Sequence, residues 1–255
     1  MRLFYQIRAA FRILLVALAI GIGALIVLLL SLLPIRVHGA KLATWPVVFM
    51  ARAFMGLMGI RYHCPDPERI RNHQGLLFCN HTSFLDILMI LYLTPARFLS
   101  TKGVRKLPVI GQLAVALDTV FVHRYNEAAR AAARDEIVAQ LRARTYPPLA
   151  IFPEGKIGPG HTVLPLRYGA FEIAKAEGIS ILPCAIVYDA LDVVTWYERA
   201  DSLIELAWQL GQQRQISAKL IPLDLIYPQP GDDIPRLAEQ VRQGIQQAIA
   251  HEIDP

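Results

Sequence analysis

The chain has 255 residues, which is enough for one sizeable domain with an appendage and too few for two large domains. With 54% hydrophobic and 18% charged residues it is more apolar than an ordinary soluble protein, and its net charge of +5 suits an anionic membrane surface. The three cysteines, Cys64, Cys79 and Cys184, are widely spaced, which argues against a disulfide framework or a zinc site. No aromatic-basic pattern favours nucleic acid, so we expect no such partner.

The first element is an uncharged apolar run from Ile13 to Leu33. As a helix, a run of this length reaches about 31 Å, close to the thickness of a bilayer's hydrocarbon core. Because arginines precede the run, a cleaved signal peptide is the alternative, but the run is longer than the roughly 7 to 15 apolar residues typical of one. We interpret it as a membrane segment.

A second apolar stretch, Thr44 to Ile60, is interrupted by Arg52. A central arginine disfavours a deep span, whereas a helix lying at the interface lets that side chain reach the headgroups. We therefore expect residues 1–60 to form an N-terminal helical membrane anchor, with 13–33 as its hydrophobic segment and 44–60 as an interfacial helix. Residues 61–255 would form the main domain. Basic residues flank both ends of the first run, so charge does not fix its orientation.

From Arg61 onward, short apolar runs alternate with amphipathic stretches. We expect strands at 76–79, 97–100, 120–123, 149–152, 181–187 and 218–221. We expect helices at 84–93, 104–117, 127–144, 168–177 and 234–253. The alternation predicts an α/β fold with a mixed, largely parallel sheet flanked by helices. Apolar residues recur at helical spacing in the last helix, which predicts that it docks on the sheet.

Polar residues separate two apolar runs in the stretch NHTSFLD, Asn80 to Asp86. On one continuous helix, His81 and Asp86 would point about 140° apart, so they can meet only if His81 precedes a helix and Asp86 lies in its first turn. Ser83 to Asp86 predicts such a start, with a serine N-cap and an acidic residue at the third helical position. A carboxylate on one ring nitrogen fixes the imidazole tautomer and leaves the other nitrogen to accept a proton. The alternative is that Asp86 only caps the helix and His81 is an ordinary surface histidine.

Four further blocks follow in order: TKGVRKLPVIGQL (101–113), VFVHRYN (120–126), IFPEG (151–155) and ILPCAI (181–186). Together with N-H-x-x-x-x-D, they resemble the glycerolipid acyltransferase family, which is typified by lysophosphatidic acid acyltransferase. The resemblance covers residues 76–187.

The resemblance implies an acyltransferase in which His81 is the general base and Asp86 orients it. The hydroxyl of a lyso-lipid, first of all lysophosphatidic acid, would attack the thioester of acyl-CoA or acyl carrier protein and give phosphatidic acid. The resemblance implies neither a metal nor a cofactor other than this acyl donor. It assigns substrate binding to Asn80, Lys102, Arg124, Glu154, Gly155 and Arg167. We expect a bacterial membrane enzyme whose catalytic domain, 61–255, faces the cytoplasm among membrane lipids.

The third block departs from the family. Many members continue it as FPEGTR, whereas this chain has Lys156 and Ile157, so a hydroxyl and a guanidinium are lost. Another lysophospholipid or a lyso-aminolipid therefore remains open as acceptor. Two other hypotheses are a lipid hydrolase with Ser83 as nucleophile, although no G-x-S-x-G is present, and a non-catalytic membrane scaffold.

Overall fold

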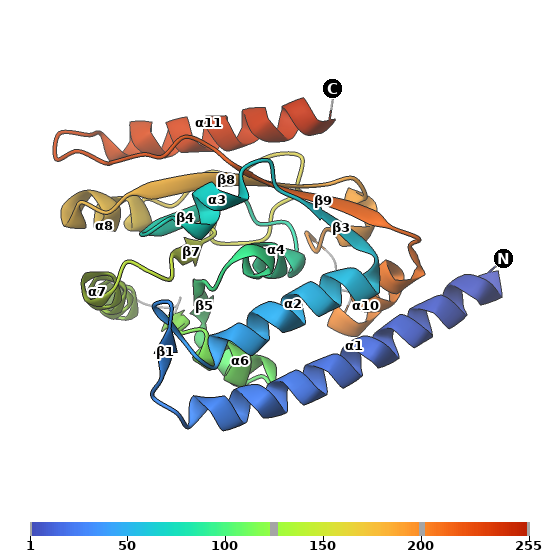
Figure 1. Cartoon of the computed structure of the whole chain (residues 1–255). Helices are drawn as coiled ribbons and strands as arrows, with labels where there is room; N and C mark the ends of the chain where they lie inside the picture. Colours follow the sequence, from blue (N-terminus) through green and yellow to red (C-terminus); the bar gives the residue numbers. More distant parts are fainter. Residues whose placement is uncertain (1, 123–126, 199–201, 254–255) are drawn as a thin grey trace.

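The computed structural model describes residues 2–122, 127–198 and 202–253, and a seven-stranded sheet forms its centre (Figure 1). In chain order the strands are β3 (Ile60–His63), β4 (Leu76–Cys79), β5 (Arg97–Thr101), β6 (Val120–Val122), β7 (Leu149–Ile151), β8 (Ile181–Tyr188) and β9 (Ile216–Pro222). Across the sheet they lie in the order β3-β9-β8-β4-β7-β5-β6. Only the β8–β9 pair is antiparallel among these neighbours. The expected α/β fold with a mixed, largely parallel sheet is confirmed.

Helices cover both faces of this sheet (Figure 1). On one face lie α2 (Thr44–Met58), α4 (Leu85–Leu93), α6 (Ile110–Ala116) and α10 (Leu203–Gln212). On the other face lie α7 (Glu127–Ala143), α8 (Gly169–Glu177) and α11 (Ile234–Ile253). Shorter elements are the hairpin β1 (Arg36–Val37) and β2 (Ala40–Lys41), and the helices α3 (Pro67–Arg71), α5 (Lys102–Arg105) and α9 (Leu191–Val194). The last helix docks on the sheet as expected, because α11 buries Leu237, Val241 and Ile245 against it.

Strand β4 is buried on both faces, as its continuous apolar sequence predicts for a strand of a parallel sheet. Leu77 and Cys79 belong to the core under α2 and α4, whereas Leu76 and Phe78 belong to the core under α8 and α11. Phe78 meets Phe171 of α8 edge to face, with 4.9 Å between ring centroids. The strand that leads into NHTSFLD is therefore fixed by packing from both sides.

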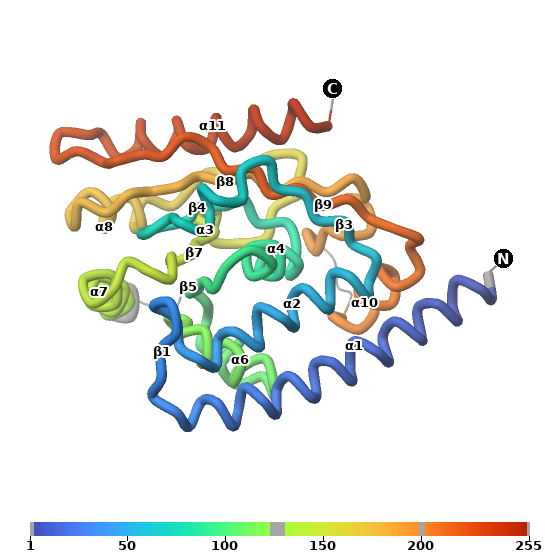
Figure 2. Tube along the Cα trace, viewed as in Figure 1, coloured from blue at the N-terminus to red at the C-terminus, as the bar shows by residue number. Residues whose placement is uncertain are grey.

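Helix α1 (Arg2–Ser31) lies outside α2 and also contacts α6 and α10, as the chain trace in Figure 2 shows. By length and composition alone, it is apolar enough to cross a membrane. Its outward side chains are large and exposed, including Leu14, Leu18, Ile22, Leu25 and Leu29. The division into an anchor, 1–60, and a catalytic domain, 61–255, stays a prediction.

Two expected helix boundaries were wrong. The helix expected at 44–60 ends at Met58, because Gly59 adopts a left-handed φ of 75° and Ile60 opens β3. The helix expected at 104–117 is divided into α5 and α6, because Pro108 lacks an N–H and Val109 has a φ of 63°. The strands β1, β2 and β3 and the helices α3, α9 and α10 were not expected at all.

Arg97, at the start of β5, is a fully buried cation that supports the loop before β7. Its Nε donates to the carbonyl of Pro147 at 2.8 Å, and its two terminal nitrogens donate to the carbonyls of Arg144 (2.9 Å) and Gln140 (3.2 Å). Burial lowers the pKa of Arg97 to about 10, so the guanidinium stays charged at neutral pH. One side chain thus satisfies three carbonyls beside the sheet.

We predict that Arg97→Met destabilises the fold by about 3 kcal/mol or more, because three carbonyls lose a charged donor. Thermal unfolding in detergent measures the effect as a lowered transition midpoint. Arg61→Met, at an exposed position of β3, is the control and leaves the midpoint within a degree or so of the parent value. Equal midpoints for the two variants would contradict the role given to Arg97.

Candidate active site

Three neighbouring parallel strands, β4, β7 and β5, end at the same edge of the sheet. His81 follows β4, Glu154 follows β7 and Lys102 follows β5. Ligand sites of open parallel sheets lie at this edge, where the carboxyl ends of the strands meet. The topology therefore gathers residues that are distant in the sequence.

His81 is held by two contacts. Its Nδ1 lies 2.8 Å from Oδ2 of Asp86, and its ring stacks on Phe152 with 4.1 Å between centroids and 15° between planes. The side chain is 20% exposed. Within the described part of the chain no hydrogen bond engages Nε2, so this nitrogen is the one left to exchange a proton.

Asp86 is a fully buried carboxylate in the first turn of α4. Besides His81, its Oδ2 accepts the main-chain N–H groups of Thr82 (2.6 Å) and Ser83 (2.9 Å). Its Oδ1 accepts the hydroxyl of Tyr188, at the end of β8, at 2.7 Å. A buried charge is tolerated only when it is paired and hydrogen-bonded, and four donors satisfy this one. Burial raises the pKa of Tyr188, which keeps its phenol protonated as a donor.

The predicted capping box is half correct. Asp86 does reach back to the main chain of Ser83, but α4 has Phe84 at its N-cap and the hydroxyl of Ser83 caps nothing. The reason is that the N–H of Asp86 bonds the carbonyl oxygen of Ser83 instead, at 3.3 Å. The Ser83 hydroxyl is left fully buried without a partner in the described structure.

Asn80 joins β4 to β8 through its side-chain amide. Its Nδ2 donates to the carbonyl of Ile186 at 2.9 Å, and the N–H of Ile186 donates to its Oδ1 at 2.7 Å. Both polar atoms of the amide are thus engaged by main chain, and the residue is buried. The contact fixes the point where β4 gives way to the His81 loop.

Glu154 is a second buried carboxylate at this edge. Its Oε1 accepts the main-chain N–H of His81 at 2.8 Å, and its Oε2 accepts that of Leu164 at 2.9 Å. Burial raises the pKa of Glu154, and the two N–H groups oppose that shift. His81 is therefore held through its side chain by Asp86 and through its main chain by Glu154.

Two other predicted binding residues, Gly155 and Lys102, follow the strands β7 and β5. Gly155 has a φ of 70°, and any side chain there would overlap the side chain of Arg167, which is exposed. Lys102 is exposed at the start of α5, and no ion pair involves it in the ranges the structure describes. Arg124 lies outside the described residues.

Sequence reasoning missed three residues of this site: Tyr188, Phe152 and Gly158. The N–H of Gly158 donates to the carbonyl of His81 at 2.6 Å, and a Cβ at this position would lie 2.7 Å from Oε2 of Glu154. The glycine run Gly158-Pro159-Gly160 was the available signal for this close approach. Tyr188 offered only a polar atom at the end of an apolar strand.

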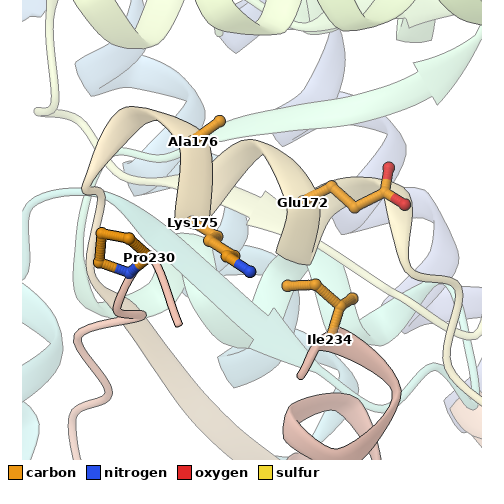
Figure 3. A pocket seen from close by; sticks show the side chains of 5 residues that line it. All are labelled: Glu172, Lys175, Ala176, Pro230 and Ile234. Carbon is orange, nitrogen blue, oxygen red and sulfur yellow. The ribbon is translucent and has the colours of Figure 1, made fainter. Parts of the chain in front are cut away.

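The arrangement is a His–Asp pair in which Nε2 of His81 has no partner among residues 2–122, 127–198 and 202–253 and can accept a proton. Among the described residues, no group of three His, Cys, Asp or Glu side chains is placed to hold a metal ion. A cavity of about 400 Å³ lies elsewhere, between α8 and the segment before α11 (Figure 3). Its two charged side chains are already engaged, because Lys175 donates to the carbonyl of Asp232 and Glu172 pairs with Arg134.

Known proteins resemble this chain in sequence and in fold. A family model described as Acyltransferase matches residues 61–187. A lyso-ornithine lipid O-acyltransferase of Rhodobacter capsulatus is 28% identical over 246 residues, covering 91% of this chain and 87% of that protein. One from Brucella abortus is 31% identical over 181 residues, covering 66% of each chain. The crystal structure of the 1-acyl-sn-glycerophosphate (LPA) acyltransferase PlsC from Thermotoga maritima superposes with a TM-score of 0.73 at 19% identity, covering 99% and 96% of the two chains.

The buried hydroxyl of Ser83 generates a prediction about the hydrolase hypothesis. A nucleophile must be reachable, so we expect a fluorophosphonate probe to leave Ser83 of the folded protein unlabelled. Mass spectrometry of peptides from treated protein measures this, with Ser202, an exposed helix cap, as an internal comparison. Stoichiometric labelling that disappears in Ser83→Ala would restore the hydrolase.

Proposed function

The chain belongs to the glycerolipid acyltransferase family, and we propose that it transfers a fatty acyl group from a thioester donor to the hydroxyl of a lyso-lipid at a membrane. The observation that carries the proposal is the buried Asp86 bonded to Nδ1 of His81, while no described residue bonds Nε2. The pair lies where the strands β4, β5 and β7 end, and Glu154 bonds the main chain of His81 there.

In the proposed reaction, Nε2 of His81 removes the proton of the acceptor hydroxyl as its oxygen attacks the thioester carbonyl. The C–S bond then breaks, the acyl group stays on the acceptor oxygen as an ester, and the thiolate takes the proton back from the imidazolium. Asp86 stabilises that imidazolium, because its carboxylate bonds the Nδ1 side of the ring. Acyl-CoA or acyl carrier protein would supply the thioester, and the reaction needs neither metal nor other cofactor.

For the acceptor, we propose a lyso-aminolipid of the lyso-ornithine type as first candidate. Two relatives, matched over 91% and 66% of this chain, are named as lyso-ornithine lipid O-acyltransferases. The chain also lacks the threonine and arginine that would follow FPEG, and its Gly158 binds the His81 loop instead. Lysophosphatidic acid, the acceptor first expected, is the second candidate, since a fold neighbour is named for it and Lys102 and Arg167 are exposed cations at this edge.

We further propose that residues 1–60 attach the enzyme to a bacterial membrane with the catalytic domain on the cytoplasmic side. The apolar α1 supports the membrane part of this proposal. The cytoplasmic side follows from the donor, because acyl-CoA and acyl carrier protein are soluble there. Lys102, Arg124, Gly155 and Arg167 would then hold the polar head of the acceptor, while Asn80 and Glu154 position the His81 loop.

The central prediction concerns His81 and Asp86. We expect His81→Ala to lower kcat by about 10² to 10⁴, because the general base is lost, and Asp86→Asn to lower it nearly as far. Transfer of radiolabelled acyl groups to lyso-ornithine lipid and to lysophosphatidic acid, in vesicles, measures both effects. His63→Ala, at an exposed position of β3, is the control and keeps full activity.

The acceptor panel separates the candidates. Product only with lyso-ornithine lipid establishes the first acceptor, and product only with lysophosphatidic acid replaces it with the second. No transfer to any acceptor by folded protein, from either acyl-CoA or acyl carrier protein, would overturn the enzyme proposal in favour of the membrane scaffold.

A further prediction concerns Tyr188, which we propose as a positioning residue. Tyr188→Phe removes one donor from the buried Asp86, and we expect kcat to fall by roughly 10- to 100-fold with KM unchanged for both substrates. Steady-state kinetics with each substrate varied in turn measures this. Tyr62→Phe, at a largely buried tyrosine of β3, is the matched control. A raised KM with unchanged kcat would contradict the assignment.

A further inference from the structure

Besides the outward face of α1, the structure exposes a second apolar surface, which lies next to that helix. The α5–α6 turn, Arg105 to Ile110, joins two short helices at the edge of the sheet that carries His81. Leu107 is 47% exposed, Val109 38% and Ile110 40%, and Val115 of α6 adds another exposed apolar side chain at 44%. Apolar residues gathered in this way on an ordinary soluble surface would be unfavourable, so they call for a partner.

The turn is built to project these side chains. Val109 adopts a φ of 63°, which is costly for a β-branched residue. Gly111 allows α6 to approach the end of α5, because any Cβ there would overlap the carbonyl of Arg105. The N–H of Gly111 also bonds the carbonyl of Leu107 at 2.8 Å. The segment from Leu107 to Ile110, which we call the apolar tip, therefore has a defined conformation.

Cations surround the tip. From Ile87 to Leu117 the sequence contains no Asp or Glu, whereas Lys102, Arg105 and Lys106 are all exposed. An apolar tip with flanking cations matches the two layers of an anionic bilayer surface, since the apolar side chains enter below the headgroups and the cations meet the phosphates.

The tip is continuous with the apolar face of α1. Helix α6 packs on α1, and the two lie side by side in Figures 1 and 2. A cavity of about 290 Å³ between α6 and the segment that follows α1 is lined by apolar side chains such as Leu33, Ile35 and Val115 and by Arg36 and Lys41. The two apolar surfaces thus join along one side of the molecule.

We propose that the α5–α6 turn is a second membrane-docking element, which enters the same lipid surface as α1. Because α5 begins where β5 ends, this contact holds the His81 edge of the sheet against the membrane. An acceptor could then present its hydroxyl to His81 while its acyl chain stays in the bilayer. This consequence rests on the proposed function, but the docking itself does not.

A fluorescent label tests the docking in the full chain. We attach NBD at Ile110→Cys in a Cys64→Ser background, since Cys79 and Cys184 are buried, and reconstitute the protein in phosphatidylglycerol–phosphatidylethanolamine vesicles that contain a nitroxide phospholipid. The expected result is quenching comparable to that of a label at Leu18→Cys on α1. A label at Gln240→Cys, exposed on α11 in the opposite layer, stays unquenched.

Quenching at Ile110 no greater than at Gln240 would overturn the proposal, whatever Leu18 shows. Shielding of the Ile110 label by added acyl carrier protein without lipid quenching would assign the surface to a protein and overturn it as well. These outcomes do not depend on turnover, so they remain readable even if no acceptor is acylated.

Steady-state kinetics test whether docking of the α5–α6 turn helps the enzyme use an acceptor that lies in the bilayer. We expect the double variant Leu107→Gln/Ile110→Gln to lose about tenfold or more in kcat/KM on a vesicle-borne acceptor, because less apolar surface enters the bilayer. Its activity on a short-chain acceptor dissolved as monomers stays unchanged, and Tyr227→Gln, an exposed apolar position elsewhere, is the control. An equal loss on both acceptors would overturn the docking role by placing the turn at the bound substrate.

Discussion

A carboxylate excluded from solvent holds this site together. Removing the charge of Asp86 from water costs several kcal/mol unless every oxygen is well hydrogen-bonded. Its donors come from three places: the side chain of His81, the main chain of Thr82 and Ser83, and the hydroxyl of Tyr188 on β8. The His81 loop, the first turn of α4 and the end of β8 can therefore shift only together. The orientation of the His81 imidazole therefore depends on the position of β8 in the sheet.

A second carboxylate, that of Glu154, also restricts the position of His81. Glu154 holds the main chain of His81, whereas Asp86 holds its ring. Glu154 follows β7 and His81 follows β4, and these strands pair in parallel with Phe78 opposite Ile151. A change of register between β4 and β7 by one residue would separate Glu154 from the main chain of His81, since it would turn the side chains of one strand to the other face. Packing of β4 in the core on both faces opposes that change, so core packing and the position of the His81 loop are coupled.

From local spacing, the sequence predicted the contact between His81 and Asp86. It did not predict the contact between Tyr188 and Asp86, which are far apart in the chain. His81 and Asp86 are five residues apart, so a strand, a turn and a helix start were enough to bring them together. Tyr188 is 102 residues from Asp86, and its strand reads as wholly apolar, so no local pattern links the two. The serine cap failed for a similar reason, because the Ser83 carbonyl took the bond that its hydroxyl was expected to accept. Pro108 was a sequence signal that could have predicted the division of 104–117 into two helices. Gly59 could likewise have predicted the end of α2.

The departure from FPEGTR bears on both geometry and specificity. In this chain Lys156 to Gly160 passes over the His81 loop, where Gly158 bonds the His81 carbonyl and Gly160, with a φ of 89°, lies against Thr82. Side chains at these glycines would collide with Glu154 or Thr82, so the segment can pack closely on the loop only with glycine at both positions. Of the exposed cations at the same edge, Lys102 would bind the acceptor head as a point charge, whereas Arg167 offers a guanidinium fork. A site of that kind can accept a carboxylate as readily as a phosphate, which is the property that a lyso-aminolipid acceptor requires.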